Sequence, residues 1–130
     1  MLGRSSRGSL VACRTCMGDT TTDLTTSAGL ADKLGEVQVV DCREPYEWVA
    51  GHLEGSIHLP LNAILAGSIG ALDAGKTTVV VCRSGNRSEL ASLMLQARGF
   101  EAHNLERGLE EWESQGRPLV TDDGQPGRVA

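Results

Sequence analysis

Short apolar runs and longer stretches with helical spacing alternate along the chain from about residue 24 onward. The short runs predict four strands, at residues 37–41, 56–59, 78–82 and 102–105. The run TVVVC at 78–82 is apolar and mostly β-branched, as expected of a central strand that is covered on both faces. This strand ends at a cysteine, Cys82.

The segments between and around these strands predict five helices. The first runs from a cap at Thr26 or Ser27 to Gly35, and the others lie at 44–50, in part of 61–72, at 88–98 and at 109–115. The residues expected on the buried face of the 88–98 helix are Leu90, Leu93, Met94 and Ala97. Alternating strands and helices are typical of an α/β fold with a parallel sheet, whose binding sites lie beyond the carboxyl ends of the strands.

The length of 130 residues suits one domain with a modest core. Residues 1–22 are rich in Gly, Ser, Thr and Arg and lack periodicity, so we expect a flexible N-terminal segment. Residues 119–130 have the composition of a solvated tail, so we expect a flexible C-terminal tail. The folded domain is therefore predicted to span residues 23–118. Met17 would serve as well as Met1 for a natural start, and the sequence leaves that choice open.

The formal net charge of -5 argues against nucleic acid or an anionic membrane as a partner, because both require a basic surface. The longest apolar run is far shorter than the roughly 20 residues of a membrane span. The four cysteines, at positions 13, 16, 42 and 82, do not resemble the disulfide framework of a small secreted domain. We therefore expect a soluble cytoplasmic protein. We discount a redox role for Cys13 and Cys16, because they lie in the flexible segment.

The segment CRSGNRS at residues 82–88 joins the strongest strand to the helix that follows it. A strand-loop-helix turn gathers backbone N–H groups around one point, and the helix N-terminus adds positive potential. Such a turn stabilises an anion, so we expect the pKa of Cys82 to be lowered and this residue to be a catalytic nucleophile. The alternative is a small buried side chain at the end of a strand.

Six further loop residues are predicted to bind an anionic substrate. They are Arg83, Ser84, Gly85, Asn86, Arg87 and Ser88. Gly85 permits the tight turn, and the two arginines would hold the anion if their side chains turn toward it. The alternative for each arginine is a solvated surface side chain.

Three motifs, in this order along the chain, resemble those of the rhodanese family. Residues 39–61 (VVDCREPYEWVAGHLEGSIHLPL) contain its D-x-R-E and G-H-x-x-G-[SA]-x-[NH]-[IL]-P elements, and residues 79–88 (VVVCRSGNRS) resemble its active-site loop. Residues 104–112 (NLERGLEEW) are similar to its N-L-x-G-G-x-x-x-W closing motif. The chain departs from the pattern at Arg107, which replaces the first glycine of the pair, and at Cys42, where an apolar or hydroxyl residue is usual.

The resemblance implies a rhodanese-like fold with a five-stranded parallel sheet and helices on both faces. It also implies a thiosulfate sulfurtransferase, in which Cys82 becomes a persulfide and passes its outer sulfur to cyanide, a thiol or a protein cysteine. Arg83 and Arg87 would hold the sulfonate oxygens of the donor, and neither a metal nor an organic cofactor is expected. The alternatives are a phosphatase or arsenate reductase that uses the same cysteine, and a non-catalytic binding module. The C-X4-R spacing, shorter than the C-X5-R of related phosphatases, disfavours the phosphatase.

Three residues near the first motif are expected to be accessory. Asp41, Arg43 and Glu44 predict an ion-paired brace at a strand end, with direct contact of Asp41 or Arg43 to the site as the alternative. Cys42 follows a strand that should neighbour the strand of Cys82, so both cysteines should lie near the same edge of the sheet. We hypothesise that the two can close a disulfide and so resolve the persulfide, the alternative being a small buried side chain.

The histidines and tryptophans are expected to have structural roles. His52 and His58 lack partners with the spacing of a zinc site, so we expect no metal there. Trp48 and Trp112 are most simply packing residues.

Overall fold

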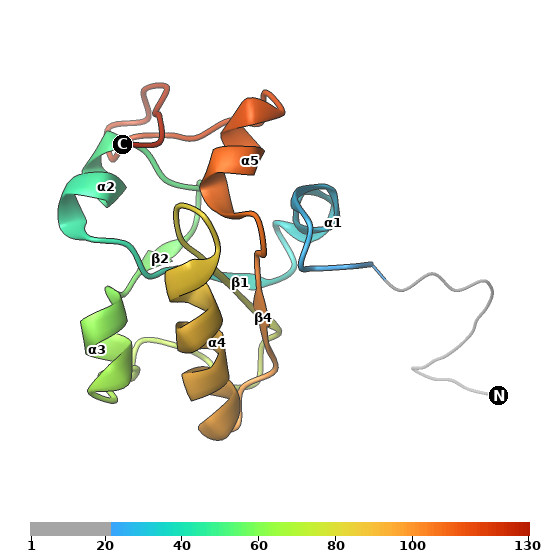
Figure 1. The fold of residues 1–130 in the computed structure, drawn as a ribbon, viewed down its shortest axis with the longest axis vertical. Coiled ribbons are helices and arrows are strands. Elements are labelled where there is room, and N and C mark those ends of the chain that lie inside the picture. Colours follow the sequence, from blue (N-terminus) through green and yellow to red (C-terminus); the bar gives the residue numbers. More distant parts are fainter. Residues whose placement is uncertain (1–21) are drawn as a thin grey trace, which may run out of the picture.

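The computed structural model of the chain describes residues 22–130, in which strands and helices alternate as predicted (Figure 1). In chain order the elements are α1 (Ser27–Lys33), β1 (Gln38–Asp41), α2 (Pro45–Ala50), β2 (Ile57–His58), α3 (Leu61–Leu65), β3 (Thr78–Val81), α4 (Asn86–Ala97), β4 (Ala102–Asn104) and α5 (Gly108–Ser114). Thr26 caps α1, as predicted, because its hydroxyl accepts a hydrogen bond from the N–H of Gly29 at 3.0 Å.

Residues 1–21 lie outside the described part of the chain. The predicted flexible N-terminal segment therefore falls outside it except for its last residue, and so do Met17, Cys13 and Cys16. Among the helices of residues 22–130, none combines the length and the apolar character that crossing a membrane requires.

The sheet is parallel throughout, and its strand order is β2-β1-β3-β4. The longest register joins the two central strands and runs from Gln38 opposite Thr78 to Asp41 opposite Val81. The sheet of residues 22–130 has four strands rather than the five that the family resemblance implied. The hydrophobic pattern contains only four strand-like runs, and each of these four is a strand in the structure.

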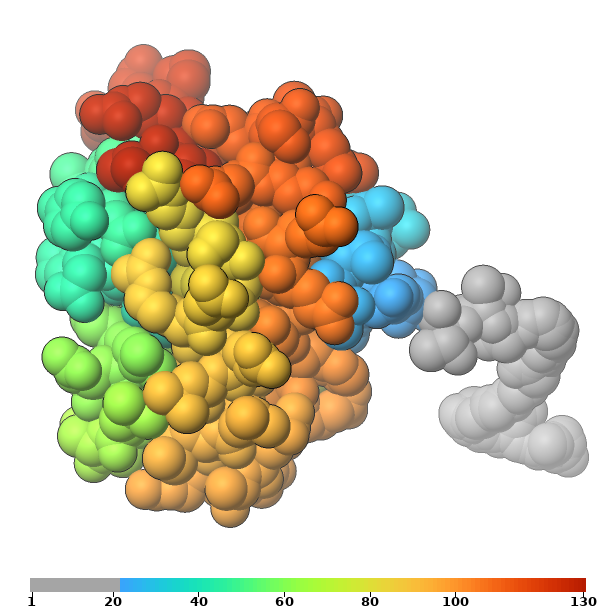
Figure 2. Space-filling view, in the orientation of Figure 1, coloured from blue at the N-terminus to red at the C-terminus, as the bar shows by residue number. Residues whose placement is uncertain are grey.

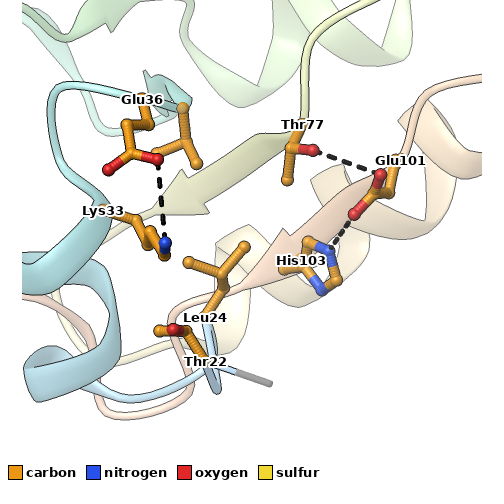
Figure 3. A pocket seen from close by; sticks show the side chains of 8 residues that line it. Thr22, Leu24, Lys33, Glu36, Thr77, Glu101 and His103 are labelled. Carbon is orange, nitrogen blue, oxygen red and sulfur yellow. Dashed lines mark hydrogen bonds and ion pairs between the residues drawn. The ribbon is translucent and has the colours of Figure 1, made fainter. Parts of the chain in front are cut away.

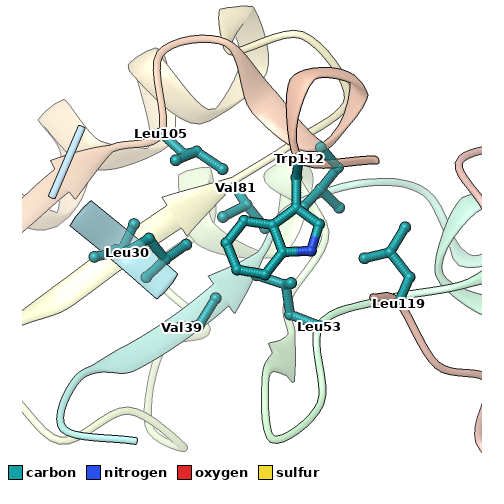
Figure 4. Close-up of a cluster of buried hydrophobic side chains, with 9 residues drawn as sticks. Leu30, Val39, Leu53, Val81, Leu105, Trp112 and Leu119 are labelled. Atoms are coloured by element: carbon teal, nitrogen blue, oxygen red, sulfur yellow. The ribbon is translucent and has the colours of Figure 1, made fainter. Parts of the chain in front are cut away.

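Two hydrophobic clusters cover the two faces of the sheet, because successive strand residues point to opposite sides. On one face Val39 and Val81 pack with residues of α1 and α5 around Trp112, which is 2% exposed (Figure 4). On the other face Val40 and Val80 pack with residues of α3 and α4. Helices therefore cover both faces, as predicted, and the loops at the strand ends are the accessible parts of the sheet.

Helix α4 begins two residues earlier than the predicted helix, and the face predicted to be buried is wrong. Its buried residues are Ser88, Ala91, Ser92 and Leu95. Leu90 and Leu93, which were expected in the core, are 48% and 55% exposed. The observed and predicted sets have the same helical spacing and lie about 160° apart around the helix, so periodicity alone does not choose between them. The face with small side chains packs on the sheet, and the hydroxyl of Ser92 is satisfied within the helix by the carbonyl of Glu89.

Residues 119–130, for which the sequence predicted a flexible tail, fold back onto the domain. Leu119 is 4% exposed and belongs to the cluster around Trp112. Val120 forms a bridge with His52, in which each backbone N–H donates to the other carbonyl, at 2.9 and 2.8 Å. Leu119, this pair of backbone hydrogen bonds and the hydrogen bonds from the N–H groups of Arg128 and Val129 to Ala50 and Glu113 hold a segment whose overall composition is polar.

Candidate active site

The loop between β3 and α4 carries the predicted nucleophile and lies between α2 and α5 (Figure 2). Cys82 directly follows the last residue of β3 and is 1% exposed. Gly85 ends the loop with a φ of 97°, a left-handed conformation that residues with a side chain rarely adopt. A Cβ at this position would lie 2.0 Å from the carbonyl oxygen of Glu106. The loop therefore requires glycine at position 85.

Hydrogen-bond donors from the loop and from the first turn of α4 surround the sulfur of Cys82. The N–H groups of Gly85 and Ser88 donate to Cys82 Sγ at 3.1 and 3.4 Å, and the Oγ of Ser88 lies 3.3 Å from the same atom. A hydrogen bond from Cys42 and these donors lower the pKa of Cys82 to about 4, against the burial that raises it. Cys82 is therefore a thiolate at neutral pH, as expected from the loop sequence.

Cys42 lies beside Cys82 at the end of the neighbouring strand. It directly follows β1, its N–H donates to the carbonyl of Val81 at 3.0 Å, and it is fully buried. The hydrogen bond to Cys82, followed by burial, raises the pKa of Cys42. The two side chains therefore share one proton, which stays on Cys42 while Cys82 carries the charge. Both are free thiols, brought together as their predicted positions at one sheet edge required.

Arg87, in the first turn of α4, forms a bidentate ion pair with Glu47 of α2. Its Nη1 and Nη2 lie 2.7 and 2.9 Å from the two carboxylate oxygens, and Glu47 also accepts from the N–H of Glu44 at 3.0 Å. The hydrogen bond to Arg87 lowers the pKa of Glu47. The pKa of Arg87 is raised, first by Glu47 and to a smaller degree by the charge on Cys82. A guanidinium has five N–H donors, so Arg87 keeps donors beyond the two that it gives to Glu47.

Arg83, Ser84 and Asn86 are exposed on the outer side of the loop. The Nε of Arg83 lies 2.9 Å from a carboxylate oxygen of Glu110, and both of these side chains are about half exposed. The structure therefore does not bring the Arg83 side chain to the sulfur. The surface position that was the alternative for this residue is the one observed.

Asn104 of β4 braces the loop from the side. It accepts a hydrogen bond from the Ser88 hydroxyl, and its Nδ2 donates to the carbonyl of Gly85 at 3.1 Å. The Ser88 hydroxyl carries a single proton, so while Asn104 accepts that proton the Cys82 sulfur depends on the backbone N–H groups and on Cys42. Asn104 thus fixes both residues whose N–H groups contact the sulfur.

The first turn of α5 also packs against the loop. The N–H of Leu109 donates to the carbonyl of Cys82 at 2.9 Å. Gly108 has a φ of 65°, and a Cβ there would lie 2.3 Å from the carbonyl oxygen of Arg83. Arg107, which departs from the family's glycine pair, has an ordinary φ of -98°. Only the second position of the pair therefore requires glycine, and arginine at the first leaves the turn intact.

Glu47 and Asn104 are site residues that were not expected from the sequence. Both lie within the family-like motifs, but their partners on α4 are 40 and 16 residues away in the chain. Contacts over such distances depend on how the helices dock on the sheet. No local pattern around either residue indicates them.

Asp41 and Arg43 form the predicted ion-paired brace at the end of β1, but Glu44 is not part of it and is instead the N-cap of α2. The Nη2 and Nε of Arg43 donate to the Asp41 carboxylate at 2.7 and 2.9 Å, and neither side chain is exposed. The same Nη2 donates to the carbonyl of Gly51 at 2.6 Å, and the ring of His58 bonds the carbonyl of Arg43 at 2.8 Å. The brace therefore fixes the chain on either side of Cys42.

The two histidines of the first motif pack on the same tryptophan. The ring centroids of His52 and His58 lie 3.5 and 4.9 Å from that of Trp48. The Nδ1 of His52 also lies 2.9 Å from the carbonyl oxygen of Trp48. These contacts confirm the structural roles predicted for the three residues.

A separate hollow of about 370 Å³ lies near the starts of β1, β3 and β4, away from Cys82 (Figure 3). Its charged side chains pair with their neighbours: Lys33 with Glu36 at 3.7 Å, and Glu101 with both Thr77 and His103 at 3.1 Å. The hollow therefore contributes nothing to the site at Cys82.

Comparison with known proteins agrees with this geometry. The model of the rhodanese-like domain family matches residues 26–115. The thiosulfate sulfurtransferase GlpE of Pseudomonas aeruginosa is 38% identical over 89 residues, which cover 68% of this chain and 79% of that protein. An uncharacterized protein of Synechocystis is 38% identical over 91 residues, which cover 69% of this chain but only 50% of that protein.

Solved structures give the same result. The crystal structure of a rhodanese-related protein from Thermoplasma volcanium has a TM-score of 0.71 and 31% identity, and the match covers 75% of this chain and 96% of that one. A rhodanese-like domain protein from Staphylococcus aureus has a TM-score of 0.66 and 28% identity, with coverage of 75% and 95%. The family match over residues 26–115 and these structural matches agree with the fold described above. The chain belongs to the rhodanese-like domain family.

Proposed function

We propose that this protein is a sulfurtransferase that carries a sulfane sulfur as a persulfide on Cys82. One observation above all supports the proposal: the Cys82 sulfur lies at the carboxyl end of a central strand, contacted by the N–H groups of Gly85 and Ser88, with a pKa lowered to about 4. A thiolate in such a position is a strong nucleophile that the same donors continue to stabilise as its charge moves outward.

In the first step the Cys82 thiolate attacks the outer sulfur of thiosulfate. A bond forms between the two sulfurs, the sulfur–sulfur bond of thiosulfate breaks, and sulfite leaves with the bonding electron pair. The negative charge then lies on the outer sulfur of the persulfide, within reach of the loop N–H groups. Arg87, a cation fixed beside the loop by Glu47, would bind the sulfonate oxygens through its remaining donors.

In the second step an acceptor attacks the outer sulfur and Cys82 leaves as the thiolate. Cyanide would give thiocyanate, and a thiol or a protein cysteine would become a persulfide. The low pKa of Cys82 makes it a good leaving group in this step, for the same reason that it is charged at neutral pH. The partners are thus a small anionic sulfur donor and a nucleophilic acceptor.

Two observations favour sulfur transfer over phosphate chemistry. Only four residues separate Cys82 from Arg87, and within this short loop the N–H groups converge on the sulfur atom itself. The GlpE proteins, among the relatives that match this chain, are named as thiosulfate sulfurtransferases. We also place the protein in the cytoplasm, where a reducing environment keeps Cys82 available as a thiolate.

The test is intact mass after incubation with thiosulfate, run alongside a thiosulfate:cyanide assay and a generic phosphatase assay. We expect a gain of one sulfur atom that cyanide removes, and thiocyanate production that Cys82→Ser abolishes. Hydrolysis of an aryl phosphate in place of sulfur transfer would support a phosphatase, and an inert protein would support a binding module. An unchanged rate in Cys82→Ser would contradict the scheme.

A further inference from the structure

We propose that Cys42 is a resolving cysteine, which attacks the inner sulfur of the Cys82 persulfide, expels hydrosulfide and closes a disulfide between Cys42 and Cys82. This inference rests on the proposed function, because that function forms the persulfide. It adds a second outcome for the bound sulfur: release as hydrosulfide when no external acceptor takes it.

The strand register places the two cysteines side by side. Asp41 is opposite Val81 in the parallel pair β1 and β3, and the hydrogen bond from the N–H of Cys42 to the carbonyl of Val81 continues the pairing by one residue. Neighbouring strands lie about 4.8 Å apart. This spacing is within the Cα–Cα range of about 4.4–6.8 Å that disulfides span. The strand pairing therefore meets the Cα–Cα condition for a disulfide.

The side chains also point the same way. Both cysteines belong to the cluster between the sheet and helices α3 and α4, and each is the largest influence on the pKa of the other. Cys42 is 0% exposed, and its thiol lies among buried residues of this chain that include Cys82.

The step balances without an added oxidant. The Cys42 thiol gives its proton to the outer sulfur and forms a bond to the inner sulfur of Cys82. The bond between the inner and outer sulfurs breaks, and hydrosulfide leaves with the electron pair. Cys42 is oxidised and the sulfane sulfur is reduced. A dithiol reductant is then required to open the disulfide and restore Cys82, as in ordinary thiol-disulfide exchange.

The loop favours this direction of electron flow. During the attack negative charge grows on the outer sulfur, and the N–H groups of Gly85 and Ser88 converge from the loop, whereas Cys42 lies at the end of the neighbouring strand β1. Donors aimed at the developing charge stabilise the leaving group. The disulfide in turn stops further sulfur loading until it is reduced, so a chain without an acceptor undergoes one turnover and stops.

The experiment is a single turnover of the reduced full-length chain with thiosulfate, in the absence of cyanide and thiols. Sulfite and hydrosulfide are measured, and the quenched protein is alkylated and digested with trypsin. Each of the four cysteines falls in a different tryptic peptide, and Cys42 and Cys82 lie in LGEVQVVDCR and TTVVVCR. We expect about one equivalent each of sulfite and hydrosulfide per chain, and these two peptides joined by a disulfide.

Cys42→Ser is the matched variant, since serine keeps a hydrogen-bond donor but forms no disulfide. Its sulfite burst shows that the variant is folded and loaded. The extra sulfur should then persist on TTVVVCR, and hydrosulfide should fall to background. Sulfite release by the native chain with a persistent persulfide, or with the extra sulfur moved to LGEVQVVDCR, would overturn this inference and leave the proposed function standing. Absence of sulfite would overturn both.

Discussion

Replacing Cys42 by alanine tests how the charge on Cys82 is held. The substitution removes the thiol that donates to Cys82, while the N–H groups of Gly85 and Ser88 stay in place. A hydrogen bond to a charged group contributes about 1.5–3 kcal/mol, and a thiol is a weak donor, so the lower figure applies. Because one pKa unit corresponds to about 1.4 kcal/mol, we expect the pKa of Cys82 to rise by about one unit.

The assay is a pH titration of the ultraviolet absorbance of the thiolate, with the Cys82→Ser chain subtracted as the baseline. For the native chain the midpoint should reflect the Cys82 pKa of about 4. Cys42→Ser, which keeps a donor of similar size, should shift the midpoint less than Cys42→Ala. An unchanged midpoint in Cys42→Ala would show that the loop amides hold the charge alone, and would refute the part assigned to Cys42.

Three other predictions concern the ion pairs and the pH dependence. Arg87→Ala should mainly raise the KM for thiosulfate in steady-state assays. Arg83→Ala should raise this KM less, because the Arg83 side chain pairs with Glu110 at the surface. Equal increases in the two variants would contradict the positions observed. Asp41→Asn should lower the free energy of unfolding in urea by about 3–5 kcal/mol, since it leaves the buried Arg43 charge uncompensated, and a loss below 1 kcal/mol would argue against that brace. The folded-state pKa of Cys82 is below its unfolded value, so the unfolded chain binds more protons between these values. The free energy of unfolding of the reduced native chain, relative to that of Cys82→Ser, should therefore rise with pH between about 5 and 8, by at most about 1.4 kcal/mol per pH unit. A difference that stays flat or falls with pH would count against the lowered pKa.

Local sequence signals predicted the strands, the loop and the position of Cys82 at the end of the central strand, because each depends on neighbouring residues. The run TVVVC becomes β3 and places Cys82 at the carboxyl edge of the sheet, and the glycine at position 85 supplies the positive φ that the turn needs. The position of Cys42 beside Cys82 also followed, since consecutive parallel strands of one sheet share that edge. Chemistry that depends on the end of a strand is thus accessible to sequence reasoning.

Features that depend on how the helices pack on the sheet and on one another were not predicted. The leucines of α4 match a buried face by spacing, yet the opposite face, with its serines and alanine, packs on the sheet. The side chain of Arg83 turns to Glu110, and Arg87 to Glu47, according to where α5 and α2 lie. These choices are made by elements 27 and 40 residues away in the chain, and spacing within one helix or loop does not contain them.

The packing of Leu119 also decides where a minimal domain has to end. The family match stops at residue 115, but Leu119 seals the cluster around Trp112, and the indole N–H of that tryptophan donates to the carbonyl of Pro118 at 2.9 Å. A chain shortened to the matched residues would leave the ring open to water on one side and its N–H without that acceptor. An expressed domain of this protein should therefore include Pro118 and Leu119, several residues beyond the end of the family match.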